Sequence, residues 1–230
     1  SVTYETVKNK EIAFEGGKLI GDFLNLTNDF DASQLIEVIP KFHDMSSRFS
    51  QFEDSIKVAS QERLAQAKSY IDLVWSLKDE MHILQNLKES GEIKLRVTHN
   101  DTKISNVLFD KNNKGLCVID TDTVMPGIIH YDFGDAIRTI CNTAAEDETN
   151  LELVQFNLDY YKAYLKGFLK EMNSSLSPIE LKYLPLGAKS MIFIMALRFL
   201  TDYMNGDIYY KITYPEHNLD RAKNQFKLIE

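Results

Sequence analysis

Residues 97–123 hold the side chains with the clearest chemical potential in this chain of 230 residues. His99, Asp101 and Asn106 follow the spacing His-x-Asp-x-x-x-x-Asn, and Asp120 stands at the end of the next apolar run. This is the spacing of a loop in which a carboxylate accepts the proton of a hydroxyl that attacks a phosphate, followed by an aspartate that holds a metal ion. The segment therefore predicts phosphoryl-transfer chemistry.

Each oxygen-bearing side chain of this segment suits one role. Asp101 is the predicted general base. The amide oxygen of Asn106 and the carboxylate of Asp120 are predicted Mg²⁺ ligands, because Mg²⁺ favours one or two carboxylates together with phosphate and water. Asp122 lies two residues after Asp120, so on an extended backbone it faces the same side and is a further candidate metal ligand. Lys103 is a candidate phosphate contact, acting as a point charge.

Other polar residues around this segment are predicted to be structural. The ring of His99 is expected to bond backbone carbonyls and so fix the loop. Asp132, Phe133 and Gly134 spell the D-F-G of protein kinases, but they lie too far after the loop and no predicted strand precedes them. Asp132 is instead expected to cap the following helix or to bond the catalytic loop. We expect Asp135 and Arg138 to pair on that helix.

The composition limits the class of partner. The chain is 44% hydrophobic and 26% charged, which is ordinary for a globular protein. A net charge of −8 argues against nucleic acid and against an anionic membrane surface as partners. A phosphate-handling site in this chain must therefore depend on metal ions and a few local donors.

The cysteines and the apolar runs bear on location. Cys117 and Cys141 form no C-x-x-C pair, and both are expected to be buried free thiols, which predicts a cytoplasmic location. The longest apolar run, 191–200, is interrupted by Arg198 and suits a buried core helix rather than a membrane span. The N-terminal residues lack the apolar core of a signal peptide.

The predicted fold class is α+β, predominantly helical, with a small β insertion that carries the polar loop. Residues 1–10 show no pattern and are predicted to be a flexible start. Short helices around a bend are expected within 31–58, and Ser177-Pro178 should open a helical region. Longer helices are expected over about 11–30, 60–88, 132–143, 149–172, 186–204 and 218–229. Ser60 should cap the second of these, and Ser90-Gly91 should end it. Strands are expected at 94–98, 106–109 and 116–120, with a hairpin turn at 110–115.

These motifs together resemble the aminoglycoside phosphotransferase and choline kinase superfamily. The resemblance is carried by 99–106, 119–127 and 131–135. Within the superfamily, D-T-K in the loop and D-T-V-M-P-G after the second strand are most similar to N-acetylhexosamine 1-kinases. The segments 198–203, 206–210 and 218–222 also resemble that family, so the likeness covers about 11–230.

The resemblance implies a protein-kinase-like fold, ATP as co-substrate and Mg²⁺ as cofactor. It implies phosphorylation of the anomeric hydroxyl of N-acetylglucosamine or N-acetylgalactosamine, with Asp101 contacting the sugar as the base. Arg198 and Tyr209 are further candidate sugar contacts by this match. The alternative is an ion pair of Arg198 with Asp202 beside an amphipathic tyrosine. Asn100 stands where the superfamily usually has glycine, so a changed loop backbone is expected.

The resemblance also implies that 11–230 form the C-terminal lobe of such a kinase. Neither a Gly-rich phosphate loop nor the strand lysine of a V-A-I-K motif occurs in these residues, so the N-terminal nucleotide-clamping lobe is absent from them. We therefore expect this chain alone to bind ATP poorly and to turn over little. Apolar surface left near 11–30 and 94–110 is expected to allow self-association.

Three other functions stay open at this point. One is a related small-molecule kinase acting on choline or an aminoglycoside. Another is a non-catalytic lobe that binds a sugar or a protein partner. A third is sugar hydrolysis by Asp120 and Asp122, but residues two apart on one strand are poorly placed to flank a glycosidic bond. The exact sugar and the hydroxyl phosphorylated stay undetermined by the sequence.

Overall fold

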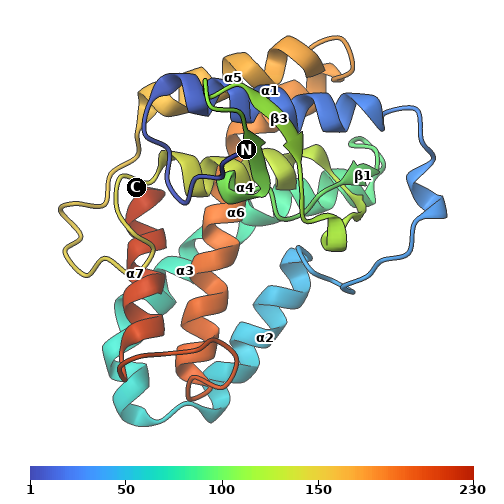
Figure 1. Cartoon of the computed structure of the whole chain (residues 1–230). Coiled ribbons are helices and arrows are strands. Elements are labelled where there is room, and N and C mark those ends of the chain that lie inside the picture. The colour runs from blue at the N-terminus through green and yellow to red at the C-terminus, as the bar shows by residue number, and fades with distance from the viewer. The chain divides into compact units, whose positions relative to one another are not determined.

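The computed structural model describes all 230 residues, which form mostly helices and two small antiparallel sheets (Figure 1). The helices are α1 (Lys10–Leu26), α2 (Met45–Val58), α3 (Gln61–Glu89), α4 (Ile129–Cys141), α5 (Leu158–Met172), α6 (Pro178–Met204) and α7 (His217–Leu228). The strands are β1 (Arg96–Thr98), β2 (Val107–Phe109), β3 (Gly115–Val118) and β4 (Met125–Gly127). Short 3-10 turns are η1 (Ala32–Gln34), η2 (Ile104–Asn106) and η3 (Thr121–Thr123). The predicted fold class, predominantly helical α+β, is confirmed.

The residues divide into two compact units. Unit 1 comprises Ser1–Pro40, Leu87–Asn142 and Asn157–Ala188, and unit 2 comprises Lys41–Asn86, Thr143–Phe156 and Lys189–Glu230. The whole segment 97–123 therefore belongs to unit 1, whereas Arg198 and Tyr209 belong to unit 2. The interpretation of 11–230 as one kinase-like lobe stays a prediction.

The helices α1 and α5 lie side by side in unit 1 (Figure 1). Glycines make this approach so close that a Cβ added at Gly17 or Gly167 would collide with a backbone carbonyl of the other helix, at Tyr164 or Phe14. A helical glycine costs about 1 kcal/mol against alanine in an isolated helix. Here the absence of a side chain lets the two backbones pack directly, so Gly17 and Gly167 support the pairing of α1 with α5.

The two sheets of unit 1 frame the polar loop. β1 pairs with β4, with Thr98 opposite Met125, and β2 pairs with β3, with Val107 opposite Val118. The hairpin between β2 and β3 turns at 110–115 as predicted. Asp110 Oδ1 accepts the backbone N–H groups of residues 112 and 114, which closes this turn. The strand β4 was not predicted, because it is three residues long and centred on a proline.

The N-terminal residues make specific contacts in unit 1. The backbone N–H and C=O of Val2 bond those of Phe109, each at 2.9 Å. The side chain of Asn9 caps α1 by accepting the N–H of Ile12 at 2.9 Å. The flexibility expected for residues 1–10 stays a prediction.

The boundaries of α3 agree with those expected, but those of α5 and α6 differ. Ser60 caps α3 and Gly91, at φ +77°, follows its end, as predicted. The helix α5 begins only at Leu158, because the side chain of Asn157 accepts the N–H of Tyr160 and starts the helix there. The helix α6 runs unbroken from Pro178 through an internal proline. The expected start of a helix at 149 and the expected break before 186 are therefore wrong.

The helix α6 is long and apolar enough to cross a membrane by length and composition alone, which the sequence pattern did not indicate. However, 72% of its most apolar stretch is buried inside the protein, as in a core helix.

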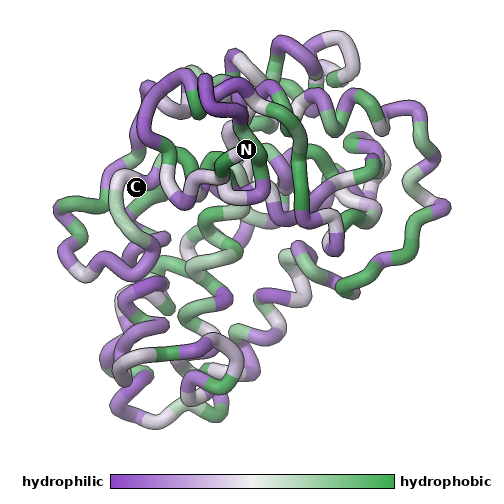
Figure 2. Tube along the Cα trace, in the orientation of Figure 1, coloured by the Kyte–Doolittle hydropathy of each residue, from purple (hydrophilic) through white to green (hydrophobic).

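Cys141 is buried as predicted, but Cys117 is exposed. The neighbouring Leu116 is exposed as well, at 53%, so this part of β3 lies at the surface. A further apolar stretch lies in the loop between α1 and α2, where Ile36 is 80% exposed (Figure 2).

Unit 2 has an aromatic core of its own. The ring of Phe49 on α2 stacks on Phe193 at 5.8 Å between centroids, and Phe193 contacts Phe226 of α7 edge to face at 6.2 Å. Tyr70 of α3 stacks on Phe226, with 5.5 Å between the ring centroids. Ring pairs in these geometries stabilise a core beyond the burial of their area.

Candidate active site

Asp101 lies in the loop between β1 and η2, and its carboxylate is held at one oxygen. The Nδ2 group of Asn106 donates to Asp101 Oδ2 at 2.9 Å and to the Asp101 backbone carbonyl at 2.8 Å. Lys103 Nζ donates to the same Oδ2 at 2.7 Å. Oδ1 accepts no hydrogen bond from the protein, and the side chain is 30% exposed. One carboxylate oxygen is therefore fixed and the other is open to a substrate hydroxyl.

The amide of Asn106 is oriented by the same contacts. Because its NH₂ group faces two acceptors on Asp101, its Oδ1 points elsewhere and has no protein donor. An amide oxygen in this position is a neutral ligand for a hard cation. The hydrogen bonds between Asn106 and Asp101 therefore hold the predicted base and the predicted metal ligand in one fixed group.

Lys103 is paired with Asp101 rather than with an external group. Burial lowers the pKa of Lys103, but the hydrogen bond and the charge of Asp101 outweigh it and raise the pKa. The carboxylates of Asp120 and Asp135 act in the same direction, so both lie near this ammonium. The predicted contact of Lys103 with a phosphate stays a prediction.

His99 fixes the loop as predicted. Its Nε2 bonds the carbonyl of Ile119 at 2.9 Å, and its Nδ1 accepts the backbone N–H of Asp101 at 3.3 Å. A proton on Nε2 satisfies both bonds, so the ring is a neutral tautomer here. The ring also meets Phe23 of α1 edge to face, at 5.8 Å between centroids. His99 is therefore buried scaffolding that sets the backbone of the catalytic loop.

Asn100 adopts the left-handed backbone conformation, at φ +64°. Glycine enters this region freely, and asparagine is one of the few other residues that tolerates it. Its side-chain amide donates to the carbonyls of Thr98 and Thr123, each at 3.1 Å, and to Thr98 Oγ1 at 2.9 Å. Asn100 therefore holds a conformation that glycine would also allow, and its side chain ties it down. A change of loop backbone relative to the superfamily stays a prediction.

Asp132 holds the catalytic loop from α4, which confirms one of its two predicted roles. Its two carboxylate oxygens accept the backbone N–H groups of His99 and Asn100, each at 2.7 Å. Thr102 Oγ1 donates to the Asp132 carbonyl at 2.6 Å. Asp132 lies inside the first turn of α4, so it does not cap that helix. Complete burial raises the pKa of Asp132 to about 6, although the two backbone N–H groups oppose the rise.

Asp135 lies one turn further along α4 and pairs with Arg138 at 3.1 Å, as predicted. Burial raises the pKa of Asp135, the guanidinium of Arg138 opposes the rise, and the negative charge of Asp101 adds to it. The proximity of Asp135 to Asp101 was not predicted, because no sequence spacing links a helix to the loop that it supports.

Asp120 stands beside the loop on a constrained backbone. The backbone of Ile119 bonds Asn106 through its N–H and His99 through its C=O, each at 2.9 Å, which places the next residue at the catalytic loop. Asp120 adopts φ +64°, the left-handed region, and its side chain is exposed. A strained backbone at an exposed carboxylate is common at functional sites.

The predicted geometry of Asp122 is wrong. The expectation that it shares a side with Asp120 needs an extended backbone, but β3 ends at Val118 and residues 121–123 form the 3-10 turn η3. Thr123 in this turn donates from its hydroxyl to the His99 carbonyl at 2.7 Å. The turn therefore braces the loop, and a metal-binding role for Asp122 stays a prediction.

The oxygen donors at this site suit Mg²⁺ better than a metal ion that is coordinated by protein side chains alone. No group of three or more His, Cys, Asp or Glu side chains is gathered to hold a metal. Asn106 and Asp120 instead offer one neutral oxygen and one exposed carboxylate. Mg²⁺ is usually held in this way, by few protein oxygens, with phosphates and waters completing its shell.

Arg198 and Tyr209 lie in unit 2. The alternative prediction for Arg198, an ion pair with Asp202, is wrong. Asp202 does not pair with Arg198. Its carboxylate accepts the backbone N–H groups of residues 208, 209 and 210, at 2.8–3.1 Å, and the side-chain amide of Asn218 at 2.9 Å. Tyr209 is 72% exposed. Contact of Arg198 and Tyr209 with a sugar stays a prediction.

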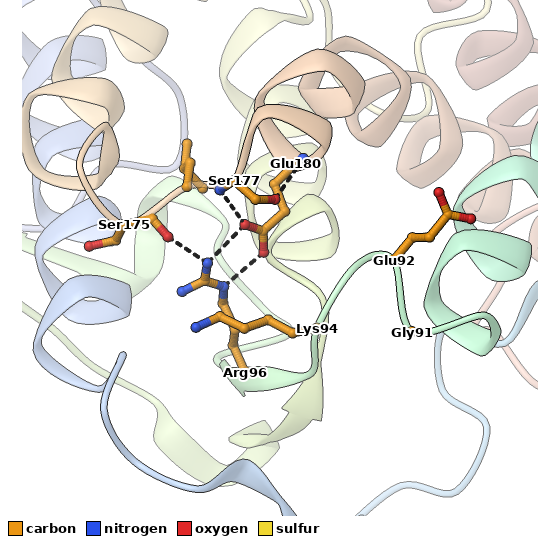
Figure 3. Close-up of a pocket in the computed structure, with 8 residues that line it drawn as sticks. Gly91, Glu92, Lys94, Arg96, Ser175, Ser177 and Glu180 are labelled. Atoms are coloured by element: carbon orange, nitrogen blue, oxygen red, sulfur yellow. Dashed lines mark hydrogen bonds and ion pairs between the residues drawn. The ribbon is translucent and has the colours of Figure 1, made fainter.

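A cavity of about 430 Å³ lies elsewhere in unit 1, between the end of α3 and the start of α6 (Figure 3). At its base Arg96 forms a two-pronged ion pair with Glu180, with both bonds at 2.9 Å and both side chains at most 2% exposed. Ser177 donates its backbone N–H to Glu180 at 2.8 Å and starts α6. The charges of Arg96 and Glu180 neutralise each other. We therefore interpret the residues at the base of this cavity as structural. The catalytic-loop residues do not line it.

We expect the replacement Arg96→Ala to cost about 3–5 kcal/mol of unfolding free energy at pH 7, because it leaves the Glu180 carboxylate buried without its cation. Burial raises the pKa of Glu180, but the bonds from Arg96 and Ser177 outweigh it, so the pKa lies below the ordinary 4.5. The ion pair therefore stabilises the fold above about pH 4.5 and is lost as the pH falls through the lowered pKa.

Urea unfolding of wild type and variant at pH 7 and pH 3.5 measures this difference. The difference should be smaller at the lower pH, because the ion pair weakens as the pH approaches the lowered pKa of Glu180. The exposed pair of Lys68 and Asp72 offers a matched control, since Lys68→Ala should cost less than about 1 kcal/mol. A cost for Arg96→Ala as small as that of the control would show that the buried pair is not a stabilising centre.

Comparisons with known proteins find similarity to small-molecule kinases. A probable ethanolamine kinase of Nematostella vectensis is 25% identical over 140 residues, which are 57% of this chain and 38% of that protein. An ethanolamine kinase of Plasmodium vivax superposes with a TM-score of 0.59 at 14% identity, covering 98% of this chain and 62% of that one. A choline kinase of Cryptosporidium parvum Iowa II superposes with a TM-score of 0.52 at 15% identity, covering 95% and 64%.

These superpositions show the fold, and they confirm the predicted protein-kinase-like architecture. The chain spans less than two thirds of the length of each of these relatives. The model of the phosphotransferase enzyme family, APH, matches residues 12–166, which are more than half of the chain and include the whole catalytic loop. The chain therefore belongs to the APH phosphotransferase enzyme family.

Proposed function

We propose that this chain carries the catalytic centre of a kinase that transfers a phosphoryl group from ATP to a hydroxyl of a small molecule. The observation that carries the proposal is the held carboxylate of Asp101, with Oδ2 fixed by Asn106 and Lys103 and Oδ1 open. Membership of the phosphotransferase family and the kinase names of the relatives support it.

Each residue of the centre has a role in this proposal. Asp101 Oδ1 orients the acceptor hydroxyl and accepts its proton. Asn106 Oδ1 and the carboxylate of Asp120 hold Mg²⁺, with Asp122 as a further candidate ligand. When bound, the ion neutralises charge on the nucleotide phosphates. Lys103 can supply a second positive charge to phosphate by leaving Asp101. Asp132 and His99 keep the loop backbone in place by the bonds described above.

N-acetylhexosamine is the first candidate acceptor. The D-T-K and D-T-V-M-P-G segments support it through their resemblance to N-acetylhexosamine 1-kinases, with Arg198 and Tyr209 as candidate sugar contacts. The second candidate is an amino alcohol, because the relatives are named as ethanolamine and choline kinases. A cytoplasmic location and self-association remain part of the proposal, and so does the low activity expected of these 230 residues alone.

A substrate panel separates the two candidates. The full gene product, with any residues outside these 230, is incubated with Mg-ATP and with N-acetylglucosamine, N-acetylgalactosamine, ethanolamine or choline, and the products are read by phosphorus NMR. An anomeric sugar phosphate supports the first candidate, and a phosphorylated amino alcohol replaces it with the second. No phosphorylated product from a nucleotide-binding, folded protein would favour a non-catalytic lobe. Robust activity from the 230 residues alone would contradict the expected dependence on further residues.

A further inference from the structure

The arginines of this acidic chain fall into two sets. The sequence has six arginines at a net charge of −8. Arg63, Arg96 and Arg138 each pair with a carboxylate, at 2.7–3.1 Å. Arg48, Arg198 and Arg221 form no ion pair, although acidic side chains outnumber basic ones in the chain. All three unpaired arginines belong to unit 2.

The unpaired arginines gather on one set of aromatic rings, Phe42, Phe199, Tyr209 and Tyr210. The guanidinium of Arg198 lies 5.5–5.9 Å from the ring centres of Phe42, Tyr209 and Tyr210. Arg221 lies 5.5 Å from Phe199, whose ring is 4.7 Å from Tyr210. Arg48 donates to the Phe42 carbonyl through Nε at 3.2 Å and Nη2 at 2.6 Å. We refer to these three arginines and four rings as the arginine cluster.

Donors in the arginine cluster exceed the acceptors that it contains. Arg198 has five N–H groups, and its one hydrogen bond goes to the weak acceptor Met195 Sδ at 3.4 Å. Burial and the neighbouring charge of Arg198 lower the pKa of Arg48, although a guanidinium stays charged at neutral pH. The hydroxyl of Tyr210 is buried without any hydrogen-bond partner. Two cations held together beside an unpaired hydroxyl are costly unless something else supplies the acceptors.

The loop that carries the two tyrosines is held in place without donors from Arg48 or Arg198, whereas Arg221 Nη1 donates to the Lys211 carbonyl and to Asn218 Oδ1, each at 3.2 Å. Asp202 accepts three consecutive backbone N–H groups, from residues 208–210, and Asn218 donates to both Asp202 and Asp207 at 2.9 Å. The rings are therefore positioned before any ligand arrives. A preformed site saves the ordering cost that binding would otherwise meet.

We propose that the arginine cluster of unit 2 is a binding site for an oxyanion, of the carboxylate, sulfate or phosphate class, carried by a small molecule. Guanidinium groups bind such anions by parallel N–H bonds, and the tyrosine hydroxyl adds one donor. A ligand that instead carries an ammonium group would meet two guanidinium charges at these rings. The inference does not rest on the proposed kinase activity, because it concerns the unpaired charges of unit 2 alone.

Sulfate is the first probe. The chain is titrated with sodium sulfate against sodium chloride of equal ionic strength, and binding is followed by NMR chemical shifts and by the melting temperature. We expect saturable binding that weakens about tenfold or more in Arg198→Gln and in Arg48→Gln, since each variant loses charge-assisted hydrogen bonds to the anion. Lys68→Gln, an exposed cation on α3, should bind as the wild type does.

Tyr210→Phe keeps the charges and the ring and removes only the hydroxyl. It should weaken sulfate severalfold, and it provides the test if an arginine variant fails to fold by circular dichroism. The absence of saturable binding in the wild type would overturn the proposal. Equal binding in wild type, Tyr210→Phe and every folded arginine variant would overturn it as well.

Two sources of the oxyanion are then separated. N-acetylglucosamine 6-phosphate is compared with uncharged N-acetylglucosamine, and ADP is added without Mg²⁺. Tighter binding of the phosphorylated sugar, abolished in Arg198→Gln, assigns the arginine cluster to an acidic sugar. Competition by ADP alone assigns it to a nucleotide phosphate. Sulfate binding that neither compound displaces would show that neither is the source.

Discussion

Replacing Asp101 by asparagine should lower kcat for phosphoryl transfer by about 10²–10⁴-fold, the usual contribution of a positioned general base. Asparagine has nearly the same shape, so the fold should survive. It cannot accept the proton that Oδ1 is placed to receive. The loss should appear mainly in kcat, measured with the full gene product and its best acceptor, because nucleotide binding does not need the base.

The control for Asp101→Asn is Asp72→Asn, an exposed carboxylate of α3 paired only with Lys68. It should retain wild-type activity. If Asp101→Asn keeps more than about a tenth of wild-type kcat while melting normally, Asp101 is not the base, and the open oxygen of its carboxylate has another use.

Replacing Asp120 by asparagine should lower kcat/KM by about 10²-fold or more at low Mg²⁺, because charge stabilisation by a catalytic metal ion contributes several kcal/mol. High Mg²⁺ should restore part of the activity, since the Asn106 oxygen would remain. Binding of Mn²⁺, followed by electron paramagnetic resonance with a nucleotide present, gives a readout that does not require turnover. The affinity for Mn²⁺ should weaken in parallel with the loss of kcat/KM.

Asp122→Asn is the informative comparison for Asp120→Asn. The 3-10 turn at 121–123 removes the extended geometry that would have aligned the two carboxylates. A smaller loss than at Asp120 is therefore expected. Equal losses of Mn²⁺ affinity in both variants would mean that the two carboxylates share the ion, whereas unchanged affinity in Asp120→Asn would remove Asp120 from the metal site.

The local parts of the catalytic loop were predictable because their causes are local. The His-x-Asp-x-x-x-x-Asn spacing located the loop, and the turn residues at 110–115, an aspartate, two asparagines and a glycine, predicted the hairpin beside it. The bonding of the His99 ring to the loop backbone was predicted as well. Ser60 and Gly91 marked the ends of α3, since capping residues act on the nearest turn.

The remaining features depend on contacts that no short segment contains. Asp132 binds the backbone of residues more than thirty positions earlier, so its role stayed one of two alternatives. Gly17 and Gly167 have meaning only once α1 lies against α5. Leu153 and Phe156 have helical spacing but lie in a loop, because Asn157 starts the helix after them.

The arginine cluster shows the same limit. Arg48, Arg198 and Arg221 are spread over the chain, and nothing in their spacing marks them as neighbours. Asp202, four residues after Arg198, looked like its partner but is used by three backbone amides instead. Only the packing of unit 2 reveals which cations lack a counter-charge.

The most direct test of the proposed catalytic centre is a crystal structure of the full gene product with Mg²⁺ and a non-hydrolysable ATP analogue. We predict an ion about 2.1 Å from both Asn106 Oδ1 and a carboxylate oxygen of Asp120, with Asp101 Oδ1 facing the terminal phosphate. An ion that contacts neither residue, or an Asp101 carboxylate turned away from the phosphate, would contradict the account.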